Sequence, residues 1–151
     1  MNSTRADPRR GARELVLQGL YQRQLSGNSD EAVRLSLLES DTFAAVDASY
    51  FAELWRGASS GWEALLRSVA PHSTRPVSEL SPIERAIVVI GAWELGERVE
   101  IPYRVVINEA VELAKTYGGT DGHKFVNGVL DKVARRVRSA EIAALARERG
   151  A

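Results

Sequence analysis

The amino-acid sequence predicts an all-α fold. Apolar residues recur at intervals of three and four along nearly the whole chain of 151 residues, which is the period of helices with one buried face. No strand-like alternation is long enough to matter, and no internal repeat is present. The interruptions are short segments rich in glycine, proline and serine, which we interpret as the connections between helices.

Composition narrows the possible classes of protein. The hydrophobic content of 44% is ordinary for a globular domain. The absence of cysteine excludes disulfides and thiolate chemistry, and with only two histidines a zinc site would have to use mainly carboxylates. We expect no metal site and no cofactor. No apolar run approaches the roughly 20 residues of a membrane span, and the polar start lacks the core of a secretory signal. We therefore expect a cytoplasmic protein that does not enter a membrane.

The first helix is expected over residues 9–26. At about 100° per residue, one arc is apolar and should face the core; it holds Ala12, Leu15, Val16, Gly19 and Leu20. The opposite arc is predicted to be exposed, and it holds Arg10, Arg13, Leu17, Tyr21 and Gln24. Guanidinium groups neutralise phosphates and a phenol ring can stack on an unpaired base, so this face suits single-stranded RNA. An ordinary polar face with a surface tyrosine is the alternative.

The middle of the chain continues the helical pattern. A buried face is predicted at Val46, Tyr50, Phe51, Leu54, Trp55 and Ala58, and the pattern resumes after the segment GASSG. The segment HSTRP, residues 72–76, breaks it. We therefore divide the chain into an N-terminal helical subdomain (1–75), a C-terminal helical subdomain (76–138) and a charged tail (139–151).

The second half opens with SPIE, residues 81–84. Ser81 can cap a helix, Pro82 fits its first position, and Glu84 can return a bond to the cap. A further helix is expected from about Val105 to Tyr117, ended by the segment GGTDG. A last long helix then runs from near residue 121 to about residue 138.

Charge is unevenly distributed, although the net charge is zero. Residues 1–13 contain Arg5, Arg9, Arg10 and Arg13 against one aspartate, residues 28–54 are mainly acidic, and the chain is basic again from residue 122. This pattern suits one anionic partner and one basic partner. Solvated helix faces without a partner are the alternative.

The segment TDGHKF, residues 120–125, suggests an acid–base pair of Asp121 and His123. The structural interpretation is stronger, because Asp121 stands where a helix cap is expected and a cap carboxylate is satisfied by backbone donors. No catalytic triad, phosphate loop or metal-ligand spacing accompanies the pair. Glu109 and Glu112, three apart on a helix, are expected to be solvated. We therefore predict that the protein is not an enzyme.

The segment LSPIERAIVVIGAWEL and the later IPYRVVINEAVELAKTYGGTDGHKFVNGVLDKVA closely resemble the NusB family of transcription antitermination factors, as does the first helix, RRGARELVLQGLYQ. The resemblance implies two packed helical bundles with about six to seven helices. It also implies a non-enzymatic protein that binds single-stranded boxA-type RNA of ribosomal RNA transcripts together with ribosomal protein NusE. RNA polymerase and other Nus factors are further implied partners.

The resemblance also implies roles for individual positions. The RNA-contacting positions fall on Arg9, Arg10, Arg13, Tyr21, Tyr117, Lys124 and Phe125. Glu79 and Glu84 lie where the family binds NusE, and Asp121 stands where the family has an acid linked to antitermination activity. Some members have arginine at the position of Val89, so one basic contact is expected to be missing here. The rival hypothesis is a helical adaptor that binds protein without contacting RNA; its RNA affinity would be absent at any salt concentration.

Overall fold

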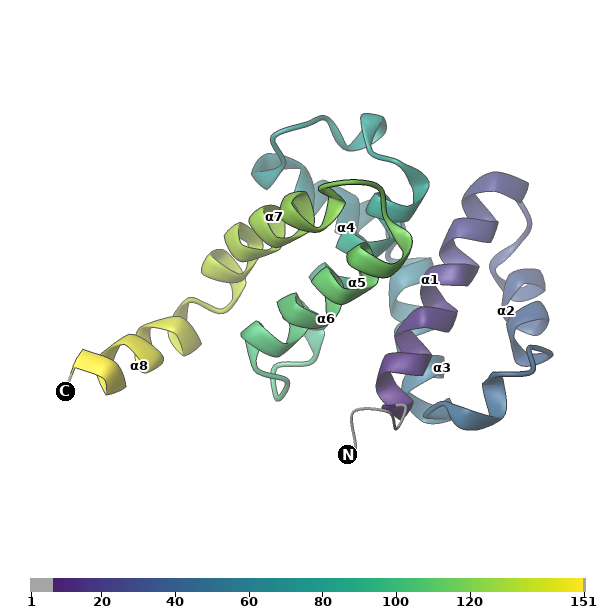
Figure 1. The fold of residues 1–151 in the computed structure, drawn as a ribbon, viewed down its shortest axis with the longest axis horizontal. Coiled ribbons are helices and arrows are strands. Elements are labelled where there is room, and N and C mark those ends of the chain that lie inside the picture. Colours follow the sequence, from purple (N-terminus) through teal and green to yellow (C-terminus); the bar gives the residue numbers. More distant parts are fainter. Residues whose placement is uncertain (1–6, 151) are drawn as a thin grey trace.

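A computed structural model describes residues 7–150, and every regular element in this range is a helix (Figure 1). The all-α prediction is confirmed, although this range contains eight α-helices rather than six to seven. Arg5 lies outside the described residues. The helices are α1 (Pro8–Ser26), α2 (Asp30–Leu38), α3 (Ala48–Ser60), α4 (Trp62–Val69), α5 (Pro82–Glu97), α6 (Tyr103–Tyr117), α7 (Gly122–Val137) and α8 (Ser139–Gly150), with short 3-10 turns η2 (Phe43–Ala45), η3 (Ala70–His72) and η4 (Val77–Glu79) between them.

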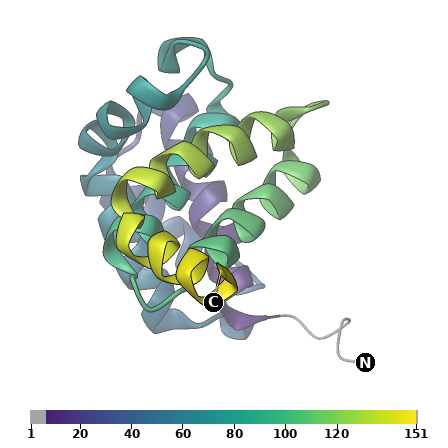
Figure 2. The same ribbon diagram turned by 90° about the vertical axis from the view of Figure 1, so that its left-hand side faces the viewer.

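Helix α5 connects two groups of helices. It contacts α1 and α3 of one group and α4, α6 and α7 of the other. Figures 1 and 2 show α6 and α7 side by side, with α1, α2 and α3 gathered in the other group. One continuous apolar core joins the groups. Helix α4 precedes residue 75 but packs most closely with α5, and the subdomain boundary at residue 75 stays a prediction. No helix within residues 7–150 is long and apolar enough to cross a membrane.

Helix α1 begins and ends with local signals in the sequence. Asp7 accepts a hydrogen bond from the backbone N–H of Arg9 at 2.9 Å, and Gly27 ends the helix in the left-handed conformation. The predicted inward arc is buried in full. Within it, a Cβ added at Gly19 would lie only 2.5 Å from Leu37 of α2 and 2.8 Å from Trp55 of α3. The close approach of three helices therefore depends on this glycine.

Helix α5 begins with the capping box that the sequence predicts. Ser81 Oγ accepts from the backbone N–H of Glu84 at 3.1 Å, and the Glu84 carboxylate accepts from the N–H of Ser81 at 3.1 Å. Pro82 stands in the first turn, where no intrahelical N–H is needed. Residues 86–92 are all buried, because neighbouring helices surround α5. Val89 is fully buried among them, so this chain has no accessible side chain at the position where some relatives have arginine, and the missing basic contact stays a prediction.

The predicted charged tail is helical in the structure and forms α8 (Figure 1). The residue before it, Arg138, is buried, and its guanidinium satisfies backbone oxygens at and beyond the C-terminal end of α5. Its N–H groups donate to the carbonyl oxygens of Leu95, Arg98 and Ile101 at 2.7, 3.0 and 2.9 Å. Glu141 of α8 accepts from Arg138 at 2.5 Å and from the backbone N–H of Tyr103 at 3.0 Å. The start of α8 therefore ties α7 to the connection between α5 and α6.

Candidate nucleic-acid interface

Arg13 is not on an exposed face of α1, and that prediction is wrong. Its side chain is 3% exposed, and its Nε donates to both oxygens of Glu94, at 3.1 and 2.9 Å. The partner carboxylate is 1% exposed and also accepts from the Tyr50 hydroxyl. Leu17, predicted on the same exposed arc, is buried as well. The reason is that α1 is packed on two sides, by α3 and by α5, so both arcs contact protein.

Arg10 and Arg9 remain accessible at the start of α1. The Arg10 side chain is 50% exposed, and its Nε and Nη2 donate to the two oxygens of Glu109 at 3.0 and 2.8 Å. This hydrogen bonding and the charge of Glu109 raise the pKa of Arg10 above its ordinary value. Glu109 was expected to be solvated, but its side chain is only 13% exposed; it pairs with Arg10 and also lies 3.5 Å from Nη1 of the buried Arg13. Arg9 lies over the ring of Tyr50, 4.4 Å from the ring centre.

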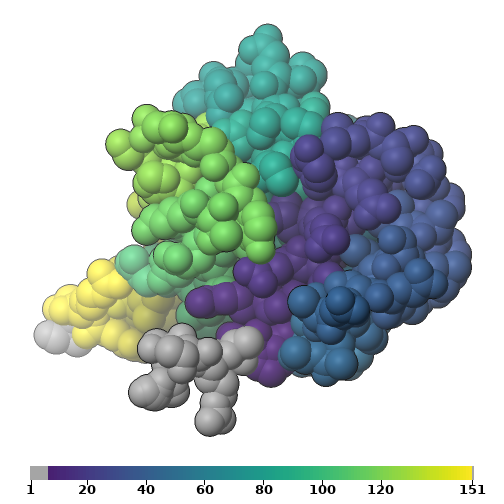
Figure 3. All heavy atoms as spheres, turned by 45° about the vertical axis from the view of Figure 1, so that its right-hand side comes forward, coloured from purple at the N-terminus to yellow at the C-terminus, as the bar shows by residue number. Residues whose placement is uncertain are grey.

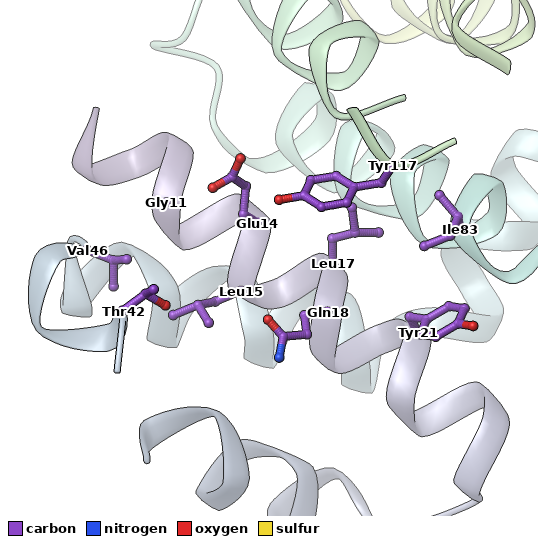
Figure 4. A pocket seen from close by; sticks show the side chains of 10 residues that line it. All are labelled: Gly11, Glu14, Leu15, Leu17, Gln18, Tyr21, Thr42, Val46, Ile83 and Tyr117. Atoms are coloured by element: carbon purple, nitrogen blue, oxygen red, sulfur yellow. The ribbon is translucent and has the colours of Figure 1, made fainter. Parts of the chain in front are cut away.

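Tyr21 and Tyr117 border a groove that runs along α1 (Figure 4). The two residues are 38% and 48% exposed. The groove encloses about 430 Å³ between α1, the connection before α3, the start of α5 and the end of α6. In the space-filling view of Figure 3, α1 is exposed between the α6–α7 region and the connection before α3. The walls include Glu14, Leu17, Gln18 and Ile83 beside the two tyrosines.

Glu14 and Gln18 are groove residues that the sequence interpretation did not single out. They lie on α1 seven and three residues before Tyr21, a helical spacing that could have found them. In Figure 4 the hydroxyl of Tyr117 points toward the carboxylate of Glu14. Burial and this neighbouring carboxylate raise the pKa of Tyr117. The groove therefore offers aromatic rings, an apolar floor and one carboxylate acceptor.

Asp121 differs from the prediction at the start of α7. It occupies the cap position, but its backbone is left-handed (φ 65°) and its side chain accepts no capping hydrogen bond. A capping side chain needs an extended backbone at that residue, which explains the difference. The exposed carboxylate instead lies 3.4 Å from Lys124 Nζ. The described part of the chain contains no group of three or more histidine or acidic side chains placed to hold a metal ion.

Phe125, near the start of α7, is linked through Arg75 to Glu84 at the start of α5. It is half-buried, and the guanidinium of Arg75 lies 4.4 Å from the centre of its ring. Arg75 Nη2 also lies 3.1 Å from Glu84 Oε2. The Glu84 side chain is therefore only 13% exposed and already has two structural partners, whereas Glu79 is exposed on η4. Of the two acids expected to meet a protein partner, Glu79 is the more accessible.

The chain matches known proteins over most of its length. Residues 10–135 match the model of the NusB family. Over 137 residues the chain is 56% identical to the transcription antitermination protein NusB of Azoarcus sp. (strain BH72), with 90% of this chain and 88% of that protein covered. The protein of the same name from Ralstonia nicotianae is 53% identical over 136 residues, with 90% and 88% covered.

Solved structures share the fold. A structure of T. maritima NusB has a TM-score of 0.76 at 27% identity, covering 85% of this chain and 92% of that chain. A NusB structure determined with NusE and double-stranded RNA has a TM-score of 0.72, covering 84% of this chain and 96% of that chain. At 24% identity, this second likeness supports the fold alone.

Proposed function

Because this chain belongs to the NusB family, we propose that it is a non-enzymatic, RNA-binding transcription antitermination factor. It binds boxA-type RNA of ribosomal RNA transcripts together with ribosomal protein NusE, and it acts in the cytoplasm with RNA polymerase and other Nus factors. The observation that most supports RNA binding is the groove between Tyr21 and Tyr117, because it brings exposed aromatic rings from both helical groups to one face. Such rings are what unpaired bases stack on.

Accessible cations supply the phosphate contacts in this proposal. Arg10 uses two N–H groups on Glu109, and a guanidinium has five, so donors remain for a phosphate oxygen. Arg9 lies beside it on α1, and Lys124 is exposed at the start of α7. Arg13 is left out of the proposed set because it is buried against Glu94. The set is therefore Arg9, Arg10, Tyr21, Tyr117, Lys124 and Phe125.

The acidic entry to α5 is the proposed surface for NusE, which as a ribosomal protein is expected to be basic. Glu79 offers an exposed carboxylate, while Glu84 acts through the helix cap and through Arg75. Asp121 is proposed to be regulatory, since it lies beside Lys124 and lowers the positive charge that a phosphate meets. Replacing Asp121 with asparagine should therefore raise RNA affinity.

A titration of labelled boxA-like RNA with the protein, with and without NusE, tests the function. We expect NusE to raise RNA affinity at least tenfold, about 1.4 kcal/mol of coupling. The reason is that one short basic helix offers few phosphate contacts. If the protein binds NusE but no RNA at any salt concentration, with or without NusE, the adaptor hypothesis replaces this proposal.

Variants separate the two kinds of contact. Arg10→Ala should weaken binding to boxA-like and scrambled RNA alike and flatten the salt dependence by about 0.7 log unit per lost contact. Arg34→Ala is the matched control, because Arg34 makes the same two-bond pair with Glu31, but on α2. Tyr21→Ala should leave the salt slope unchanged and cost about 1–3 kcal/mol of binding free energy, whereas Tyr21→Phe should keep the stack. Equal salt slopes for Arg10→Ala and the parent would contradict the phosphate role.

A further inference from the structure

We infer that the groove between Tyr21 and Tyr117 receives one unpaired guanine of the bound RNA, and that Glu14 selects it. The inference rests on the proposed function, because it assumes that single-stranded RNA crosses this face. It assigns a base identity to one place on the protein. The residues involved are Glu14 and Gln18, with the tyrosine rings as stacking surfaces.

The groove has the size and lining of a base-binding site. Its volume of about 430 Å³ lies in the range of about 300–1,000 Å³ usual for small-molecule sites. Leu15, Leu17 and Ile83 supply apolar surface, while the exposed rings of Tyr21 and Tyr117 stand at its border. The faces of an aromatic base carry no hydrogen-bonding groups, so they can be buried against these side chains without the loss of hydrogen bonds to water.

Glu14 gives this groove a negative charge that the rest of α1 does not cancel. The two arginines closest to it in α1 are committed elsewhere, Arg10 to Glu109 and Arg13 to Glu94. Among the described residues Glu14 has no ion-pair partner within 4.0 Å; the neighbour it faces is the hydroxyl of Tyr117 (Figure 4). A carboxylate without a cation repels phosphate. The groove is therefore built for the edge of a base and not for the backbone.

The chemistry of the carboxylate favours guanine. An ionised carboxylate only accepts hydrogen bonds, and it can take two donors at once. Guanine presents two adjacent donors on its Watson–Crick edge, N1–H and the N2 amino group. Adenine and cytosine offer one amino group beside an acceptor nitrogen, and uracil places carbonyl oxygens on both sides of its one N–H. Carbonyl oxygens next to the Glu14 carboxylate would repel it.

Gln18 completes the recognition of the same edge. It lies four residues after Glu14 on α1, is exposed, and lines the same groove. Residues at this spacing are neighbours on a helix surface. The Gln18 amide can donate to guanine O6, which is the atom next to N1 on the base edge. Glu14 and Gln18 together therefore match the order acceptor, donor, donor that guanine presents.

Short single-stranded RNA probes test the inference. We compare an oligouridine, the same oligouridine with one central guanosine, and the same with one central inosine, which lacks the N2 amino group. The parent protein should bind the guanosine probe about tenfold more tightly than oligouridine, as one good two-bond pair allows. The inosine probe should keep only part of that preference. Glu14→Gln should reduce the guanosine preference to about twofold or less, because one acceptor is lost.

A charge-matched variant provides the control. Glu63 is exposed on α4 and does not line the groove, so Glu63→Gln removes one negative charge elsewhere and should keep the guanosine preference. If Glu14→Gln raises affinity for all three probes equally and keeps the preference, Glu14 only repels phosphate and the inference is overturned. Equal binding of all probes by the parent overturns it too, while leaving RNA binding intact. Failure to bind any probe or boxA-like RNA would instead remove the proposed function itself.

Discussion

Replacing Arg13 with alanine tests the buried pair that holds α1 against α5. The change removes the two hydrogen bonds to Glu94, at 3.1 and 2.9 Å, and leaves a carboxylate that is 1% exposed with the Tyr50 hydroxyl as its remaining close donor. Breaking a buried ion pair from one side costs about 3–5 kcal/mol of unfolding free energy. For a chain of this size that corresponds to a fall in Tm of roughly 10 °C.

The assay is urea unfolding followed by circular dichroism, together with an RNA titration at a temperature where the variant is folded. We expect unfolding free energy to fall by about 3–5 kcal/mol. We expect RNA affinity to stay within about twofold of the parent's, a change of at most about 0.4 kcal/mol in binding free energy. A double variant, Arg13→Met with Glu94→Met, should regain most of the loss, because it leaves no unpaired buried charge. If Arg13→Ala unfolds like the parent but loses RNA affinity, Arg13 contacts RNA and the burial argument is refuted.

Three further changes have defined outcomes. Burial and Glu14 raise the pKa of Tyr117 above the value of about 10 expected in the unfolded chain, so Tyr117 should contribute a fall in unfolding free energy as pH rises past about 10. An ultraviolet titration, in which Tyr117→Phe identifies the signal of this residue, should show a lower pKa of Tyr117 in Glu14→Gln than in the parent. An unchanged pKa would contradict the contact between Tyr117 and Glu14. Gly19→Ala should cost about 1–3 kcal/mol in a urea melt, because its Cβ would overlap Leu37 and Trp55, whereas Gly128→Ala, which has open space, should be neutral or stabilising. Glu84→Ala should lower stability by about 1 kcal/mol through the lost cap and should also weaken NusE binding. Glu84→Gln keeps the cap but removes the charge, so NusE affinity equal to the parent's in this variant would limit Glu84 to capping.

Features that depend on neighbouring residues could be predicted from the sequence. The inward arc of α1 and the capping box of Ser81 and Glu84 are confirmed. Both depend on side chains that lie close together in one helix, so the spacing of residues in the sequence is enough to predict them. The accessible tyrosine of α1 was found in the same way, since Tyr21 lies on the predicted outer arc and is 38% exposed.

Features that depend on distant residues could not be predicted from the sequence. Arg13 was placed on an exposed arc because a helical projection shows two faces but not how many neighbours a helix has. Its partner Glu94 is 81 residues away, and no local pattern joins them. Asp121 has the residue type of a cap, but its left-handed backbone is set by the glycine-rich turn around it. The spacing from Tyr21 could have placed Glu14 and Gln18 beside it on α1, but only the structure brings Tyr117 of α6 to the same groove.

The buried guanidinium of Arg138 has a consequence for the order in which the chain folds during synthesis. The carbonyl oxygen of Leu95 accepts from a side chain that lies 43 residues later in the sequence. A ribosome releases the chain from its N-terminus onward, so α5 emerges with these oxygens open to water and receives their donor only after α6 and α7 have followed. The central helix of the molecule is therefore completed late. Stalling translation before residue 138 should leave a nascent chain whose α5–α6 connection is cut readily by protease, and release beyond residue 141 should protect it.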